Sequence, residues 1–160
     1  MKATASAESK TKVASPVVTA LNQYLADSYA LMALTHHAHW NVEGPGFFSL
    51  HKAFEDQYEH LFEAIDEIAE RIRALDSYAL GGLRAFAKEA GMEEFPTGAL
   101  AAKDFVAGLV VAHEKALVDA ATLRDAAGAA NDLETQDMAI GCIQWHQKTS
   151  WMLKSYLKAV

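Results

Sequence analysis

The chain has 160 residues, enough for one domain with a buried core but short for two. Its net charge of −7 argues against a basic nucleic-acid-binding body, and its single cysteine, Cys142, excludes an intrachain disulfide. No stretch is apolar enough to span a membrane, and residues 1–15 lack the apolar segment of a signal peptide, so we expect a cytoplasmic protein.

Residues 1–14 are small and polar, so we expect a flexible tail in front of one domain at residues 15–160. The pair Ser15-Pro16 predicts a helix start, with serine as the N-cap and proline in the first turn. The residues that repeat at helical spacing after it are Val17, Leu21, Leu25, Met32, Thr35 and His39. Gly44-Pro45-Gly46 is expected to end this helix.

A second helix is predicted from about Ser49 to Leu75. Its apolar residues repeat with a heptad pattern at Phe54, Tyr58, Leu61, Ile65, Ile68, Ile72 and Leu75. At about 100° per residue, four metal-binding side chains fall within an arc of roughly 100° on a flank beside these apolar residues. They are His51, Glu55, Asp66 and Glu70.

Gly81-Gly82 is followed by a short predicted helix at Leu83–Ala90, inside a long connection. A third long helix is expected from about Ala101 to Ala129, with an apolar stripe at Phe105, Leu109, Ala112 and Ala116. A fourth starts at Asn131-Asp132 and carries Met138, Cys142, Trp145, Met152 and Tyr156 at helical spacing. The pattern predicts an all-α, ferritin-like four-helix bundle with a short extra helix in the crossover between helices 2 and 3.

The spacing of the four flank residues points to a dimer. Glu55 and Asp66 are eleven residues apart, which is roughly 16 Å along a helix. Ligands lie only about 2.0–2.6 Å from a metal ion, so one chain cannot close all four around one ion. Two copies could, if the helices ran antiparallel about a two-fold axis near His60 and Leu61.

Each candidate also has a plainer interpretation: acids on a helix are commonly a solvated face, and His39 on an apolar stripe is commonly a core histidine. The combination of His39 with His51, Glu55, Asp66 and Glu70 favours a metal site. Mixed imidazole and carboxylate ligands suit iron, with zinc as an alternative. The chain contains no Glu-x-x-His, which typical di-iron bundles use within one chain.

The stretch from His36 to Arg71 resembles the signature of the Dps family of mini-ferritins, the DNA-binding proteins from starved cells. His39-Trp40-Asn41 is followed by His51, Glu55, Asp66 and Glu70 at the family's spacings of twelve, four, eleven and four residues. Glu55 stands where the best-known members have aspartate. The stretch from His146 to Leu157 is similar to the family's last helix, although Gln147 replaces a glutamate.

This resemblance implies a hollow dodecamer, built from two-fold dimers, that oxidises Fe(II) and stores ferric mineral, thereby protecting DNA from oxidative damage. Hydrogen peroxide is the usual oxidant. His39, His51 and Glu55 of one chain would bind iron together with Asp66 and Glu70 of its two-fold mate. Trp40 resembles the family's radical-trapping tryptophan, or it is a core aromatic.

The family's iron enters through acidic three-fold pores, for which Asp132, Glu134 and Asp137 are the candidates; an ordinary acidic helix N-terminus explains them too. Some members bind DNA through lysine-rich tails, and Lys2, Lys10 and Lys12 are the candidates for such contacts. The acidic body opposes them, so DNA binding and nucleoid association stay open. The alternative function is a nucleoid-compacting, DNA-binding protein with a secondary or structural metal site. The other histidines are expected to be structural or on the surface: His36, His37, His60, His113 and His146.

Overall fold

The computed structural model describes residues 15–158, so the predicted tail lies outside the described residues. Over that range the chain forms helices and no strands, which confirms the all-α prediction. The helices are α1 (Pro16–Asn41), α2 (Phe47–Ala74), α3 (Leu83–Glu89), α4 (Ala102–Ala129) and α5 (Leu133–Leu157). The short α3 lies in the crossover between the second and third long helices, as predicted.

Local sequence signals set the helix ends. The Ser15 hydroxyl accepts a hydrogen bond from the Val18 N–H (3.2 Å), and the Asp132 carboxylate accepts one from the Thr135 N–H (3.1 Å). Both side chains are therefore N-caps that satisfy free amides of the first turn. Gly46 caps α2 with a φ of 85°, and α2 begins at Phe47, two residues before the predicted Ser49.

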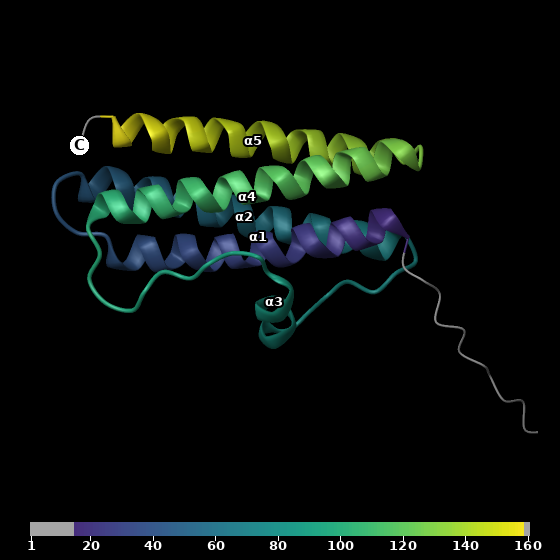
Figure 1. The fold of residues 1–160 in the computed structure, drawn as a ribbon, viewed down its shortest axis with the longest axis horizontal. Helices are drawn as coiled ribbons and strands as arrows, with labels where there is room; N and C mark the ends of the chain where they lie inside the picture. The colour runs from purple at the N-terminus through teal and green to yellow at the C-terminus, as the bar shows by residue number, and fades with distance from the viewer. Residues whose placement is uncertain (1–14, 159–160) are drawn as a thin grey trace, which may run out of the picture.

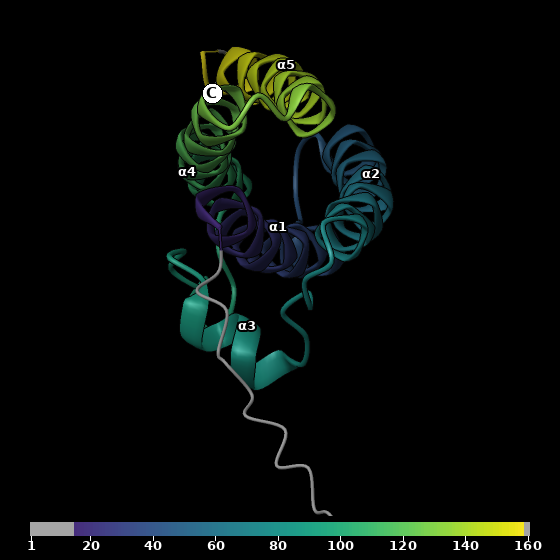
Figure 2. The same ribbon diagram turned by 90° about the vertical axis from the view of Figure 1, so that its right-hand side faces the viewer.

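The four long helices form a bundle that surrounds one core. In Figure 1 they lie side by side, and Figure 2 shows them end-on as a ring with α3 outside it, beneath α1. α1 packs against α2 and α4, α4 packs against α5, and α3 packs on the outer side of α1. No helix among residues 15–158 has the length and apolar character needed to cross a membrane.

Most of the predicted apolar stripes form the core. In α4 the predicted stripe is fully or almost fully buried, and in α2 Phe54, Leu61, Ile68 and Ile72 are buried. The stripe expected in α5 is wrong in part, because Met152 is 52% exposed. The buried side of α5 consists of Thr135, Ala139, His146, Thr149, Ser150 and Leu153. These small and polar residues do not stand out in a hydropathy pattern, which explains the error.

A hydrogen-bonded row of polar side chains crosses the middle of this core. His146 contacts the Tyr24 hydroxyl through Nε2 (2.9 Å) and His113 Nδ1 through Nδ1 (2.9 Å). His113 Nε2 in turn lies 3.3 Å from Gln57 Oε1. Because α1, α2, α4 and α5 each contribute one member, the row joins all four long helices at one level. His113 and His146 are therefore structural histidines of the core.

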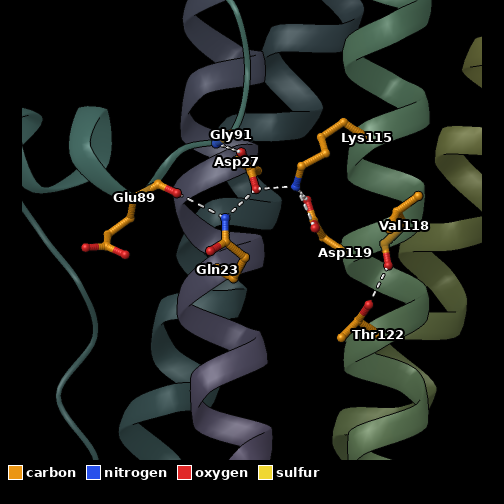
Figure 3. Close-up of polar contacts among 8 residues, drawn as sticks. All are labelled: Gln23, Asp27, Glu89, Gly91, Lys115, Val118, Asp119 and Thr122. Carbon is orange, nitrogen blue, oxygen red and sulfur yellow. Dashed lines mark hydrogen bonds and ion pairs between the residues drawn. The ribbon is translucent and has the colours of Figure 1, made fainter.

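A second polar cluster holds the crossover against the bundle, as Figure 3 shows. The buried Asp27 carboxylate on α1 accepts hydrogen bonds from the Gly91 N–H (2.7 Å) and from Lys115 Nζ on α4 (2.9 Å). Lys115 also pairs with Asp119 at 2.6 Å. Burial, with Asp27 beside it, raises the pKa of Asp119 to about 6. The cluster thereby links α1, α4 and the segment that follows α3.

Candidate metal centre

Two of the predicted ligands face each other where α1 ends and α2 begins. The short turn at residues 42–46 brings these two helix ends together. His39 Nδ1 lies 2.8 Å from the carbonyl oxygen of His51, and His51 Nδ1 lies 2.9 Å from the carbonyl oxygen of His39. The two rings are stacked, with centroids 3.7 Å apart. Each histidine is thus held by the backbone of the other helix.

These reciprocal hydrogen bonds decide which nitrogen of each ring can bind a metal. A carbonyl oxygen can only accept, so Nδ1 of both rings must carry the proton and donate it. The lone pair of each neutral ring is then on Nε2. Donation from one ring nitrogen to a carbonyl is the arrangement that orients a metal-binding histidine. His39 and His51 could therefore bind a cation through their two Nε2 atoms.

Glu55 lies one turn after His51 on α2, and its carboxylate forms an ion pair with Lys52. Lys52 Nζ lies 2.7 Å from Glu55 Oε2 and 2.9 Å from Asp56 Oδ1. The hydrogen bond from Lys52 and the positive charge of its ammonium group lower the pKa of the Glu55 carboxyl. The Glu55 carboxylate is thus held in the anionic form that a hard cation requires.

The two remaining candidates lie further along the same helix. Asp66 and Glu70 belong to the uninterrupted α2 and are exposed to solvent. Among residues 15–158, no three His, Cys, Asp or Glu side chains come together as a group that could hold a metal ion. His39, His51 and Glu55 at one end of α2, and Asp66 and Glu70 at the other, are separate parts of the chain. We call the first group the histidine half-site and the second the acidic half-site.

Aromatic side chains surround the histidine half-site. Tyr58 packs edge-on against His39, with ring centroids 5.2 Å apart, and packs against His36 in a tilted arrangement, with centroids 4.0 Å apart. His36 also stacks on Trp40, at 5.1 Å. Trp40 is 71% exposed, so its interpretation as a core aromatic does not hold. The sequence pattern places Tyr58 among the apolar residues of the second helix and does not mark Tyr58 or His36 as a neighbour of the site, although both lie one helical turn from a predicted ligand.

The acidic residues at the start of α5 differ in what they contact. The Asp132 carboxylate caps α5 and forms an ion pair with Arg71 Nη2 on α2 at 2.7 Å. Glu134 and Asp137 are exposed. Asp132 therefore has a structural role within the chain, while a pore role for the three residues stays a prediction. The tail residues Lys2, Lys10 and Lys12 lie outside the described part of the chain.

Comparisons with known proteins agree with the fold. A family model for the ferritin-like domain matches residues 18–160. A DNA protection during starvation protein from Brevibacillus brevis is 33% identical over 149 residues, which covers 93% of this chain and 99% of that protein.

Two solved structures are similar to the chain over most of its length. The structure of Dps from Staphylococcus aureus matches with a TM-score of 0.84 and 35% identity, covering 88% of this chain and 94% of that one. Dps from Vibrio cholerae, described as a member of a superfamily of ferritin-like diiron-carboxylate proteins, matches with a TM-score of 0.84 and 31% identity, covering 88% of each chain.

Proposed function

Because this chain belongs to the Dps family of ferritin-like proteins, we propose that it oxidises Fe(II) and stores the ferric product. Iron is the substrate of this reaction and also its cargo. The relatives named for DNA protection during starvation, and the neighbour described as a diiron-carboxylate protein, support this class of function. Zinc has no comparable support.

The observation that carries the proposal is the fixed orientation of His39 and His51. Their reciprocal hydrogen bonds leave both Nε2 atoms free, and the Glu55 carboxylate is one turn away. Two neutral imidazoles and a carboxylate suit Fe(II), whose affinity for mixed nitrogen and oxygen ligands is moderate. Removal of an electron leaves Fe(III), a harder cation that binds carboxylate oxygens more strongly than imidazole.

The acidic half-site completes the proposal through a second chain. Asp66 and Glu70 are on the same rigid helix as His51, so they cannot fold back to it. An antiparallel arrangement of two α2 helices would bring the acidic half-site of one chain to the histidine half-site of its mate. Each two-fold interface would then hold two equivalent centres. We propose that these two-fold dimers assemble into the dodecamer that the family resemblance implies.

Hydrogen peroxide is the oxidant that we propose. Two Fe(II) ions supply the two electrons that reduce one peroxide to two waters, with two protons consumed. No hydroxyl radical is released when both electrons arrive together, and DNA is thereby protected without being bound. The net negative charge of the chain repels DNA phosphates, so we favour iron storage over the alternative of a nucleoid-compacting protein.

Anaerobic titration with Fe(II), followed by hydrogen peroxide or oxygen in separate samples, tests the function. We expect saturable Fe(II) binding, and a consumption of one peroxide for every two Fe(II). Oxidation at the rate of protein-free Fe(II), or a ratio of one peroxide per Fe(II) with hydroxyl radicals detected by a spin trap, would contradict the proposal.

A further inference from the structure

The contact between Lys52 and Glu55 has a consequence for iron binding. Lys52 directly follows the predicted ligand His51, and its ammonium group lies 2.7 Å from Glu55 Oε2. A metal ion bound to that carboxylate would lie within about 2.0–2.6 Å of its oxygen. A metal ion on Oε2 would collide with the ammonium group, and a metal ion on Oε1 would be repelled by it. The lysine and the metal therefore compete for Glu55.

The chain also provides a place for the lysine to go. Lys52 Nζ already lies 2.9 Å from Asp56 Oδ1, one turn further along α2. Asp56 is exposed and is not one of the predicted ligands. The Lys52 side chain is 62% exposed, so packing does not hold it in its present position. A small rotation would release Glu55 while the ammonium group keeps its contact with Asp56.

We propose that Lys52 is an internal competitor of iron: it holds the Glu55 carboxylate until Fe(II) arrives, and then moves to Asp56. This inference rests on the proposed function, since it takes Glu55 as an iron ligand. Lys52 is a positioning residue, because it acts on the metal only through Glu55. The ion pair between Lys52 and Glu55 lowers the affinity of the histidine half-site for divalent cations. Asp56 makes this loss of affinity smaller, because it gives the ammonium group of Lys52 another carboxylate to bind.

The test compares Lys52→Gln with the wild-type protein, as the assembled full-length chain, in anaerobic titrations with Fe(II). The variant removes the competing charge and keeps a side chain of similar length. We expect the apparent Kd for Fe(II) to fall about two- to fivefold, the range that exposed ion pairs contribute. The oxidation rate at saturating Fe(II) should not change, whereas the Fe(II) concentration that gives half the rate should fall.

Lys103→Gln is the matched control. Lys103 is exposed at the start of α4 and forms no ion pair with another residue of the described range 15–158. The substitution Lys103→Gln removes one positive charge from the chain, as Lys52→Gln does, but leaves the contacts of Glu55 unchanged. If Lys103→Gln tightens Fe(II) binding as much as Lys52→Gln does, the effect is one of net charge, and the competitor proposal is overturned.

A double-mutant cycle tests the role of Asp56. Asp56→Asn removes an acid near the site, so general electrostatics predicts the same weakening of Fe(II) binding with or without Lys52. If Asp56 also receives the ammonium group, the weakening will be larger when Lys52 is present than in the Lys52→Gln background. Equal effects in the two backgrounds would overturn this step.

The outcomes separate the two proposals. A wild-type protein that binds no Fe(II) overturns both the proposed function and the role of Lys52. Saturable Fe(II) binding with the same affinity in the wild type and in Lys52→Gln overturns the role of Lys52 alone. Three results together support Lys52 as a competitor of iron. Fe(II) binding is tighter in Lys52→Gln, it is unchanged in Lys103→Gln, and the double-mutant cycle is not additive.

Discussion

The Nδ1 atoms of His113 and His146 lie 2.9 Å apart in the middle of the bundle, so one of the two nitrogens donates a proton and the other accepts it. The Tyr24 hydroxyl can donate to His146 Nε2, His146 Nδ1–H to His113, and His113 Nε2–H to Gln57 Oε1. Every member of this row is satisfied when both rings are neutral. Protonation of His113 at Nδ1 would break its hydrogen bond with His146, and protonation of either ring would bury a charge.

The first prediction concerns stability in acid. Burial lowers the pKa of His113 to about 3, and burial with His113 beside it lowers the pKa of His146 to about 3. In the unfolded chain both titrate near 6.5, so below that pH the unfolded state binds more protons. The free energy of unfolding should fall as the pH decreases from 6.5, by up to about 2.7 kcal/mol per unit for the two rings together.

Chemical denaturation between pH 7.5 and 5, at one protein concentration, measures this slope. His146→Gln retains an acceptor for Tyr24 and a donor for His113, and should make the slope shallower by about half. A slope that is the same in the wild type and in His146→Gln would contradict the assignment.

The second prediction concerns the acidic half-site. Asp66→Asn combined with Glu70→Gln replaces two exposed anions by neutral amides, so the fold should be retained. Fe(II) oxidation should slow by at least about tenfold, since loss of a direct ligand should cost no less than loss of a group that supports one. Stopped-flow absorbance of the ferric product measures the rate. Wild-type rates in this variant would remove both residues from the mechanism.

The third prediction tests whether two chains share each centre. His51→Ala damages only the histidine half-site, and Asp66→Asn only the acidic half-site. Mixed assemblies of the two variants should recover part of the activity, because an interface with one chain of each contains one intact centre and one that is doubly damaged. If verified mixed assemblies recover nothing, the centre lies within one chain.

The fourth prediction concerns DNA. Contacts between phosphates and Lys2, Lys10 or Lys12 would weaken as salt rises, with a log–log slope of about −0.9 per contact. Removal of residues 1–12 should abolish such binding and leave iron oxidation unchanged, because no predicted ligand lies in the tail. Equal mobility shifts for the truncated and full-length proteins would show that the tail is not the segment that binds DNA. Absence of binding by either protein, even at low salt, would identify an iron protein without DNA contact.

The fifth prediction separates the two interpretations of Asp132. Asp132→Ala removes the N-cap of α5, which should lower the free energy of unfolding by about 0.5–2 kcal/mol, with a further loss from the Arg71 pair. Asp132→Asn keeps a capping oxygen and should cost less. If Asp132 also lines a pore, Asp132→Asn will slow iron uptake as much as Glu134→Gln or Asp137→Asn does. If the Asp132 variants change the free energy of unfolding but not iron uptake, Asp132 acts only as the N-cap of α5.

The features that depend on spacing along one helix can be predicted from the order of the residues. The caps at Ser15 and Asp132 and the placement of His51, Glu55, Asp66 and Glu70 on one helix follow from 3.6 residues per turn and from the chemistry of helix ends. The same rise per residue separates Glu55 from Asp66 along α2, so one chain cannot bring all four side chains to one metal ion. These relationships are local, so the order of the residues is enough to derive them.

How side chains from different helices meet depends on the packing of the helices in three dimensions. The rotation of α1 against α2 sets the exchange of hydrogen bonds between His39 and His51 through backbone carbonyls. Likewise, hydropathy marks His113 and His146 as ordinary polar residues, and the packing of four helices turns them into a buried pair. Partners of this kind depend on the relative rotation and depth of packed helices, which periodicity along a single helix does not specify.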